Sequence, residues 1–165
     1  MKEIFDRRSI RSFTSQNLDE DTIKELLRGA IAAPSAHKKE PRIFYVIENK
    51  DVLHEFFLKH PYGKAFETAP VAILACGDKS KDPNMTFLIQ DCAASLENIA
   101  IMATHMGLGT VWMGILDNDS AEEITKEILD LPSNLIPISI MAIGYKAEER
   151  RPHISYKEEM VKWIK

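Results

Sequence analysis

The chain has 165 residues, of which 45% are hydrophobic and 28% are charged, and its formal net charge is −4. These values are typical of a globular protein and exclude intrinsic disorder and collagen-like repeats. Net acidity argues against a nucleic-acid-binding protein, which normally carries a basic surface. The first residues contain no apolar secretion signal, and no apolar run approaches the ~20 residues of a membrane helix. We therefore expect a cytoplasmic protein with one domain, residues 1–165.

Four strands and about five helices alternate along the chain. The expected helices, recognised by apolar spacing or capping residues, span residues 18–34, 52–57, 86–106, 120–129 and 158–165. The expected strands span residues 42–48, 70–78, 109–116 and 136–145. The second of these strands is apolar almost throughout, which is typical of a strand buried on both faces. This alternation predicts a sheet covered by helices on both faces.

Local signals set the ends of several elements. Asp19 can cap the first long helix, and Pro34 ends it because proline disfavours helical geometry in the residue before it. Gly107 is placed as the residue that follows the longest helix. Ser120 and Glu123 form a capping-box pattern that predicts the start of the helix between the last two strands.

The densest charged motif contains Arg7, Arg8, Ser9 and Arg11. Three guanidinium groups and a hydroxyl within five residues can surround a phosphate, since arginine donates hydrogen bonds in a planar fork that matches phosphate oxygens. The alternative is a solvated charged face at the end of a short helix. Taken alone, the motif fits the solvated face more often than a phosphate site.

Two further segments are candidates for binding. Residues 33–41, at a helix-to-strand junction, bring together a hydroxyl, an imidazole and two ammonium groups without any glycine. Such a segment is either an ordinary polar loop or a binding loop on a rigid scaffold. Residues 106–114 contain three glycines but no phosphate-binding motif. Gly107 is explained by the end of a helix, whereas Gly114, inside a strand, indicates the close approach of a ligand or of another backbone.

No set of residues for acid–base, nucleophilic or metal catalysis is recognisable. The five histidines lack metal-binding spacing, and no hydrolase motif is present. Cys76 and Cys92 form no CxxC pair, and Cys92 lies on an apolar helix as a small core residue. Arg150 and Arg151 can be surface charges. If the chain is an enzyme, a cofactor should therefore supply the chemistry.

Four segments in order along the chain resemble the nitroreductase family: RRSIRSF, APSAHKKEPRIFYVI, QDCAASLENIAIMATHMGLGTVWMGI and IGYKAEERRPHISYKEEMVKW. The resemblance runs from Ile4 to Trp163. It implies a small FMN-dependent oxidoreductase with an α+β, nitroreductase-like fold. That fold has a central mixed sheet of about four to five strands flanked by helices. It also implies an intertwined homodimer in which each flavin site is shared between the subunits.

The resemblance also implies the FMN-binding residues. They are Arg7, Arg8, Ser9, Arg11, Pro34, Ser35, Ala36, Lys38, Met113, Gly114, Arg150 and Arg151. Residues 7–9 match the phosphate and ribityl contacts, and Arg11 matches the cation near flavin N1 and O2. Residues 34–36 match a loop that reaches the flavin of the partner subunit. The backbone of residues 113–114 matches the stretch near N5, and residues 150–151 match a basic pair that returns to the phosphate.

The chain departs from the family pattern at Lys38 and Glu40, where the family usually has Asn and Gln. A lysine beside the flavin can raise its potential, or it can form an ion pair with Glu40. The departure leaves the ribityl contact and the substrate preference open. A short connection before the strand at residues 70–78 predicts that no large lid domain covers the site.

The activity that the resemblance implies is a ping-pong reaction. NADH or NADPH gives a hydride to the flavin, and a nitroaromatic, a quinone or a similar small acceptor then takes the electrons. No catalytic side chain and no metal are assigned, and neither nucleic acid nor a membrane is an expected partner. The alternatives are a flavin-binding sensor or carrier without turnover, a specialised flavin reductase or dehalogenase of the same family, and a structural domain that binds no flavin.

Overall fold

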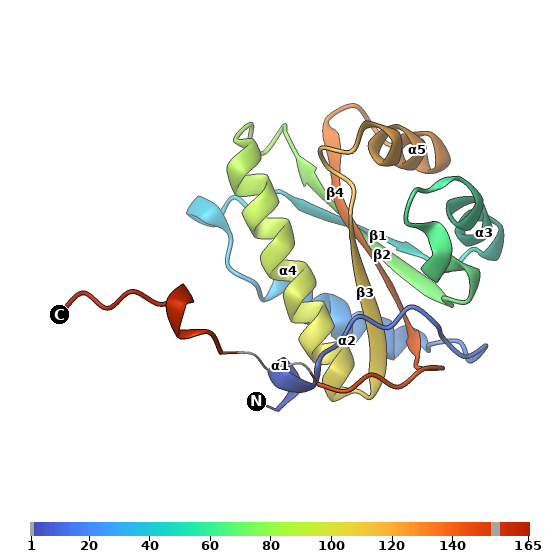
Figure 1. Cartoon of the computed structure of the whole chain (residues 1–165). Coiled ribbons are helices and arrows are strands. Elements are labelled where there is room, and N and C mark those ends of the chain that lie inside the picture. Colours follow the sequence, from blue (N-terminus) through green and yellow to red (C-terminus); the bar gives the residue numbers. More distant parts are fainter. Residues whose placement is uncertain (1, 153–155) are drawn as a thin grey trace.

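The computed structural model describes residues 2–152 and 156–165. Its centre is a four-stranded sheet with the order β1-β2-β4-β3 (Figure 1). The strands are β1 (Arg42–Ile47), β2 (Val71–Asp78), β3 (Leu108–Gly114) and β4 (Leu135–Tyr145). All three strand pairs are antiparallel, whereas we expected a mixed sheet. Strand β4 lies between β2 and β3 and is antiparallel to both of them. The strands β2 and β3 therefore run in the same direction but are not neighbours, so no two neighbouring strands are parallel.

Helices cover both faces of this sheet, as the alternation of elements predicted. They are α1 (Glu3–Asp6), α2 (Glu20–Ile31), α3 (Lys50–Lys59), α4 (Met85–His105) and α5 (Asp119–Leu129). Figure 1 shows α2 and α4 on one side of the sheet and α3 and α5 on the other. Short 3₁₀ turns occupy Ala36–Lys38, Gly63–Glu67 and Glu158–Met160.

Strand β2 connects the two halves of the core. Its alternate residues Ala72, Leu74 and Cys76 belong to the cluster that includes Phe56 of α3. Val71, Ile73 and Ala75 belong to the cluster that includes residues of α2 and α4. Every residue of β2 is buried, which confirms the prediction from its continuous apolar run. Each fully buried large aliphatic side chain contributes about 1.5–3 kcal/mol.

The predicted helix ends are largely confirmed. The Asp19 carboxylate accepts a hydrogen bond from the Thr22 N–H at 2.7 Å, and Gly107 has the left-handed φ of 76° that follows a helix. The capping box at Ser120 is wrong. Helix α5 begins earlier, because the side chain of Asn118 accepts a hydrogen bond from the Ala121 N–H at 3.2 Å.

The carboxyl-terminal segment differs from its prediction. Instead of a helix over residues 158–165, it forms one 3₁₀ turn, and Figure 1 shows that it extends away from the sheet. Trp163 is 75% exposed, so no packing stabilises a helix there, and so short a helix is marginal on its own. Among the described residues, no helix has the length and apolar character needed to cross a membrane.

Candidate functional site

A cavity of about 700 Å³ opens beside the carboxyl end of β3. Its walls come from the last residues of β3, the turn at residues 61–65 that leads into a 3₁₀ helix, the connection at 116–118 and Arg11. Pockets that hold small molecules and cofactors are usually about 300–1,000 Å³ in volume. The cavity is therefore large enough for an aromatic cofactor.

The free edge of β3 forms one wall of this cavity. The Ile10 N–H donates to the Thr110 carbonyl at 2.8 Å, so Thr110 directs its backbone groups away from β4. Because these directions alternate along an antiparallel strand, Trp112 and Gly114 also direct their N–H and C=O groups away from β4. Trp112, Met113 and Gly114 line the cavity, and the side chain of Met113 packs into the core.

The environment of Gly114 is open. A Cβ atom added at Gly114 would meet no atom within 4 Å. By contrast, a Cβ atom added at Gly109, on the same strand, would lie 2.8 Å from the side chains of Ile10 and Lys146. Packing within this chain therefore explains why residue 109 is a glycine, but it does not explain why residue 114 is one. This is the behaviour that we expect where a ligand approaches the backbone.

Two cations and two aromatic rings face the cavity: Arg11, Lys64, Tyr62 and Trp112. The Arg11 N–H donates to Glu148 Oε1 at 2.6 Å, which fixes the Arg11 backbone. This hydrogen bond, with a smaller contribution from Arg150, holds the pKa of Glu148 below its usual range, so Glu148 stays charged. The lining also contains the carboxyl group of Asp117, and Lys64 pairs with Glu67 at 2.6 Å. Arg11 is therefore the cation best placed to meet a flat ring that carries negative charge at one edge.

Lys64 and Tyr62 are cavity residues that the sequence analysis missed. They stand on either side of Gly63, where a Cβ atom would lie only 2.4 Å from the Phe56 carbonyl oxygen. Glycine therefore lets the 61–65 turn pack against the end of α3, and this packing carries Lys64 to the cavity. The Tyr-Gly-Lys sequence after a predicted helix is the only local signal for a tight turn at this position.

The predicted phosphate residues fall into two groups. Arg8 donates a hydrogen bond to the Arg151 carbonyl, so the segments 7–9 and 148–151 lie side by side. Arg8 and Arg150 line one small hollow of about 30 Å³, together with Lys146. Arg7 instead points to α4, where its Nε lies 3.3 Å from Glu97 Oε1, and Ser9 forms a bridge with Thr110.

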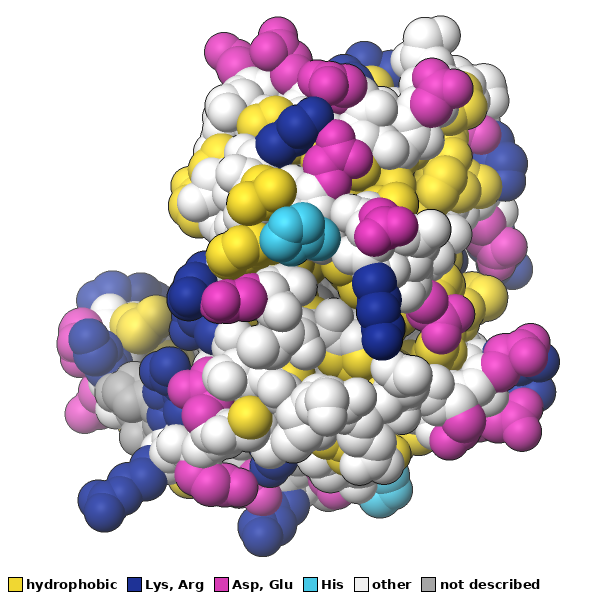
Figure 2. Space-filling model, turned by 90° about the vertical axis from the view of Figure 1, so that its right-hand side faces the viewer, with side chains coloured by type: hydrophobic (Ala, Val, Ile, Leu, Met, Phe, Trp, Pro, Cys, Tyr) yellow, Lys and Arg dark blue, Asp and Glu magenta, His cyan; other side chains and the backbone are white. Residues whose placement is uncertain are grey.

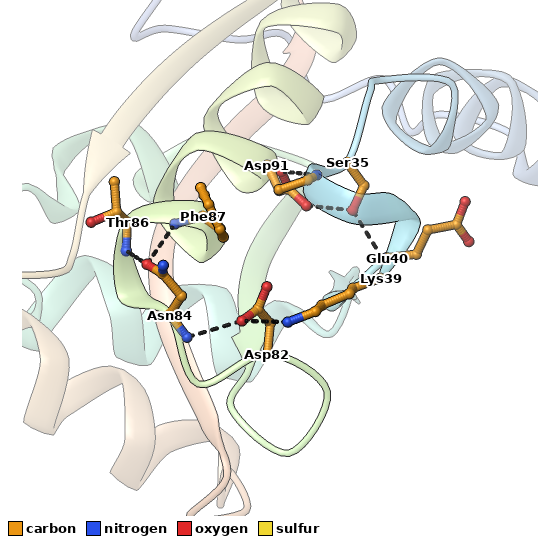
Figure 3. Close-up of polar contacts among 9 residues, drawn as sticks. Ser35, Lys39, Glu40, Asp82, Asn84, Thr86, Phe87 and Asp91 are labelled. Carbon is orange, nitrogen blue, oxygen red and sulfur yellow. Dashed lines mark hydrogen bonds and ion pairs between the residues drawn. The ribbon is translucent and has the colours of Figure 1, made fainter.

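The loop at residues 34–38 does not line the cavity of its own chain. Ser35 Oγ and the Ala36 N–H donate hydrogen bonds to Asp91 on α4 (Figure 3). The Pro34 carbonyl accepts a hydrogen bond from Arg42. The partner-subunit contact expected for this loop stays a prediction. The ion pair considered between Lys38 and Glu40 is not formed. In the described parts of the chain, Lys38 makes no ion pair, and Lys39 pairs with Asp82 at 3.2 Å.

Metal and thiol chemistry find no support at this site. Within residues 2–152 and 156–165, no three His, Cys, Asp or Glu side chains come together as metal ligands. Burial raises the pKa of both cysteine thiols, Cys76 and Cys92, to about 12, so neither is a nucleophile at neutral pH. The sequence assignment of Cys92 to the core is confirmed.

Comparisons with known proteins identify the family of this chain. The model of the nitroreductase family matches residues 4–60 and 54–145. An NADH dehydrogenase/NAD(P)H nitroreductase of Methanothermobacter thermautotrophicus is 35% identical over 148 residues, which are 90% of this chain and 78% of that protein. An NADH oxidase structure from Clostridium acetobutylicum has a TM-score of 0.93 and 30% identity, and the match covers 99% of each chain. An FMN complex of a Desulfovibrio desulfuricans nitroreductase shares the fold, with a TM-score of 0.86, 24% identity, and 99% and 95% of the two chains covered. The chain described here therefore belongs to the nitroreductase family.

Proposed function

We propose that this chain is an FMN-dependent oxidoreductase. In a ping-pong cycle it would pass electrons from NADH or NADPH to nitroaromatics, quinones or similar small acceptors. The observation that carries the proposal is the cavity where the open backbone at Gly114 meets two cations, Arg11 and Lys64. Membership of the nitroreductase family supports the oxidoreductase class.

The residues of the cavity fit the isoalloxazine ring of FMN. The uncovered edge of β3 at Gly114 leaves space for a flat ring and offers a backbone N–H to it. Arg11 would hold positive charge near the edge of the ring that gains electrons, whereas Lys64, which pairs with Glu67, would add less to it. When bound, FMN supplies the two-electron chemistry for which the chain has no side chains of its own.

We infer that the basic segments bind the phosphate of FMN. Arg8 and Arg150 line one hollow with Lys146, and the acidic residues Asp6 and Glu149 share its lining. The hollow has a volume of only about 30 Å³, so the phosphate would lie at its opening, where the two arginines would donate to the phosphate oxygens. Arg7 is held by Glu97, and the exposure of both side chains limits this ion pair to about 1 kcal/mol or less. Arg7 can therefore turn toward an anion at small cost.

We also propose that residues 1–165 form one FMN-binding domain, that two copies form a homodimer in the cytoplasm, and that the 34–36 loop completes the flavin site of the partner. Exposed apolar side chains on α1 and in the carboxyl-terminal segment support an interface: Ile4, Phe5, Tyr156, Met160, Trp163 and Ile164. Figure 2 shows acidic and basic side chains mixed with hydrophobic ones over α3 and α5. That face therefore offers no basic stripe for nucleic acid.

The first experiment is the visible absorption spectrum of the purified protein, with the mass of any released chromophore. We expect a yellow protein that releases FMN and that oxidises NADH or NADPH steadily when a quinone is present. A colourless protein that does not take up added FMN would contradict the proposal. Bound FMN without turnover would instead identify a flavin sensor or carrier.

A further inference from the structure

The loop at residues 33–40 has an unusual backbone. His37, Lys38 and Glu40 have φ values of 53°, 56° and 45°, in the left-handed region that favours glycine. A side chain with a Cβ atom is unfavourable there, and such residues persist only where the surrounding structure fixes them. Three of them in four positions indicate a loop whose conformation is imposed by its contacts.

One carboxylate on α4 provides the central contact. Asp91, which is only 5% exposed, accepts a hydrogen bond from Ser35 Oγ at 2.6 Å and another from the Ala36 N–H at 3.1 Å. Ser35 Oγ in turn accepts a hydrogen bond from the Glu40 N–H at 2.9 Å. Asp91 thus holds the start of the left-handed stretch directly at the Ala36 N–H, and it holds the end at Glu40 through the Ser35 hydroxyl (Figure 3).

Two further contacts fix the loop from other elements. The buried Arg42 guanidinium, at the start of β1, donates to the Ala33 carbonyl at 2.9 Å and to Ser95 Oγ of α4 at 3.0 Å. Lys39 pairs with Asp82, in the turn before α4, at 3.2 Å. The loop is therefore held against α4, β1 and this turn, and α4 supplies the anchor nearest to residues 34–36.

We propose that Asp91 is a positioning residue for the cofactor. It fixes residues 34–36 as a preformed edge that contacts the FMN of the partner subunit, without touching that FMN itself. This inference rests on the proposed function, in which residues 34–36 meet the flavin. A loop that is ordered before binding loses less conformational entropy on binding, so the anchor raises the affinity for FMN and slows its release.

The test compares two matched aspartates in the full-length protein. Asp78 is similarly buried, at 7% exposed, and it accepts from Ser80 Oγ at 2.6 Å and from the Ser80 N–H at 2.9 Å. It also accepts from Asn134 Nδ2 at 2.9 Å, so its loss tests general destabilisation at least as severely. Its side chain does not bind the 33–40 loop. We expect Asp91→Asn to raise the FMN dissociation constant about tenfold or more, since it weakens hydrogen bonds to a charged group. Asp78→Asn should lower the melting temperature comparably and leave FMN affinity within about twofold.

A double-mutant cycle checks the route of the effect. If Asp91 acts mainly through Ser35, the losses from Ser35→Ala and Asp91→Asn are not additive. The double variant then weakens FMN binding only slightly more than Ser35→Ala alone, because Asp91 also accepts directly from the Ala36 N–H. Ser35→Thr, which keeps a hydroxyl, should retain most of the affinity. FMN titration of each variant, followed by flavin fluorescence, gives these values. If the Asp91→Asn variant does not fold, Asp91→Ser replaces it in the same titration, because the shorter side chain stays polar but ends too far from Ser35 Oγ for this hydrogen bond.

The results that would contradict the positioning role of Asp91 differ from those that would contradict the proposed function. Wild-type affinity in the Asp91→Asn variant would overturn the positioning role and leave the proposed function intact. An equal loss of affinity in Asp78→Asn would also overturn it, because the effect would then reflect general destabilisation. A wild-type chain that binds no FMN would overturn the proposed function and this inference together.

Discussion

Replacing Gly114 with alanine should affect the stability of the apoprotein and its affinity for FMN in opposite ways. The added methyl group meets no atom within 4 Å in this chain, and the φ of Gly114 lies outside the left-handed range. The substitution also reduces the conformational entropy of the unfolded chain. The free energy of unfolding of the apoprotein should therefore stay equal or rise by about 0.4–1 kcal/mol. For a chain of this size, a change of 1 kcal/mol moves the melting temperature by about 2–4 °C.

The same methyl group should interfere with FMN. It occupies the space where the flavin ring would approach the backbone, and overpacking of this kind costs about 1–3 kcal/mol. The FMN dissociation constant should then rise by roughly 5- to 150-fold. Thermal unfolding of the apoprotein and FMN titration of the same sample measure the two effects separately.

Gly109→Ala is the matched control on the same strand. Its Cβ would lie 2.8 Å from Ile10 Cβ and from Lys146 Cγ, so this variant should lose about 1–3 kcal/mol of stability. If Gly114→Ala binds FMN as tightly as the wild type, no ligand approaches the backbone at Gly114. If the melting temperature of Gly114→Ala falls as much as that of Gly109→Ala, the added methyl group contacts other atoms of the chain, and Gly114 has no open space beside it.

Three other predictions follow from the charges and the burial. Arg11→Gln should lower the flavin midpoint potential while FMN stays bound, because a cation that favours the reduced flavin is lost. Arg8→Ala should weaken the binding of FMN and leave that of riboflavin, which has no phosphate, unchanged in parallel titrations. Burial lowers the pKa of His60, so the unfolded chain binds more protons below about pH 6.5 and the stability of the wild type falls as the pH drops from 7 to 5. Urea unfolding should show a smaller fall in His60→Leu, with the exposed His54→Gln as control.

Each of these predictions has a contradicting result. An unchanged midpoint potential in Arg11→Gln would remove that residue from the electrostatics of the flavin. Equal losses of FMN and riboflavin affinity in Arg8→Ala would mean that Arg8 does not bind the phosphate. A pH dependence that is the same in His60→Leu and in the wild type would assign the acid sensitivity to other groups.

The sequence predicted the elements well because their signals are local. The small and apolar residues that follow helical spacing on one side of α4 are all buried: Leu88, Cys92, Leu96, Ile99, Ala100 and Ala103. The end of this helix at Gly107 follows from one residue and its φ. Where two local signals compete, prediction is weaker. Asn118 and Ser120 are both good helix caps, and only the way the chain leaves β3 decides between them.

The site was predicted less completely because it depends on distant residues. Arg11 and Gly114, both named from the sequence, line one cavity, and their contact with a flavin stays a prediction. Lys64 reaches the same cavity through the packing of a turn against α3. Asp91 looked like a polar residue on an apolar helix. Its role depends on Ser35, 56 positions earlier in the sequence, and spacing within either segment gives no sign of that hydrogen bond.

Helix α4 connects the two parts of the proposed flavin site. Glu97, on this helix, pairs with Arg7 of the segment expected to bind phosphate, and Asp91 anchors the loop expected to reach the partner's flavin. The two residues are six positions apart, about 9 Å along the axis and on different sides of the helix. Since α4 is a single helix of 21 residues with a buried apolar face, it sets the distance between these two contacts. In a homodimer, the α4 of each subunit would hold that subunit's own phosphate segment at one position. At the other position it would hold the loop that contacts the flavin of the other subunit.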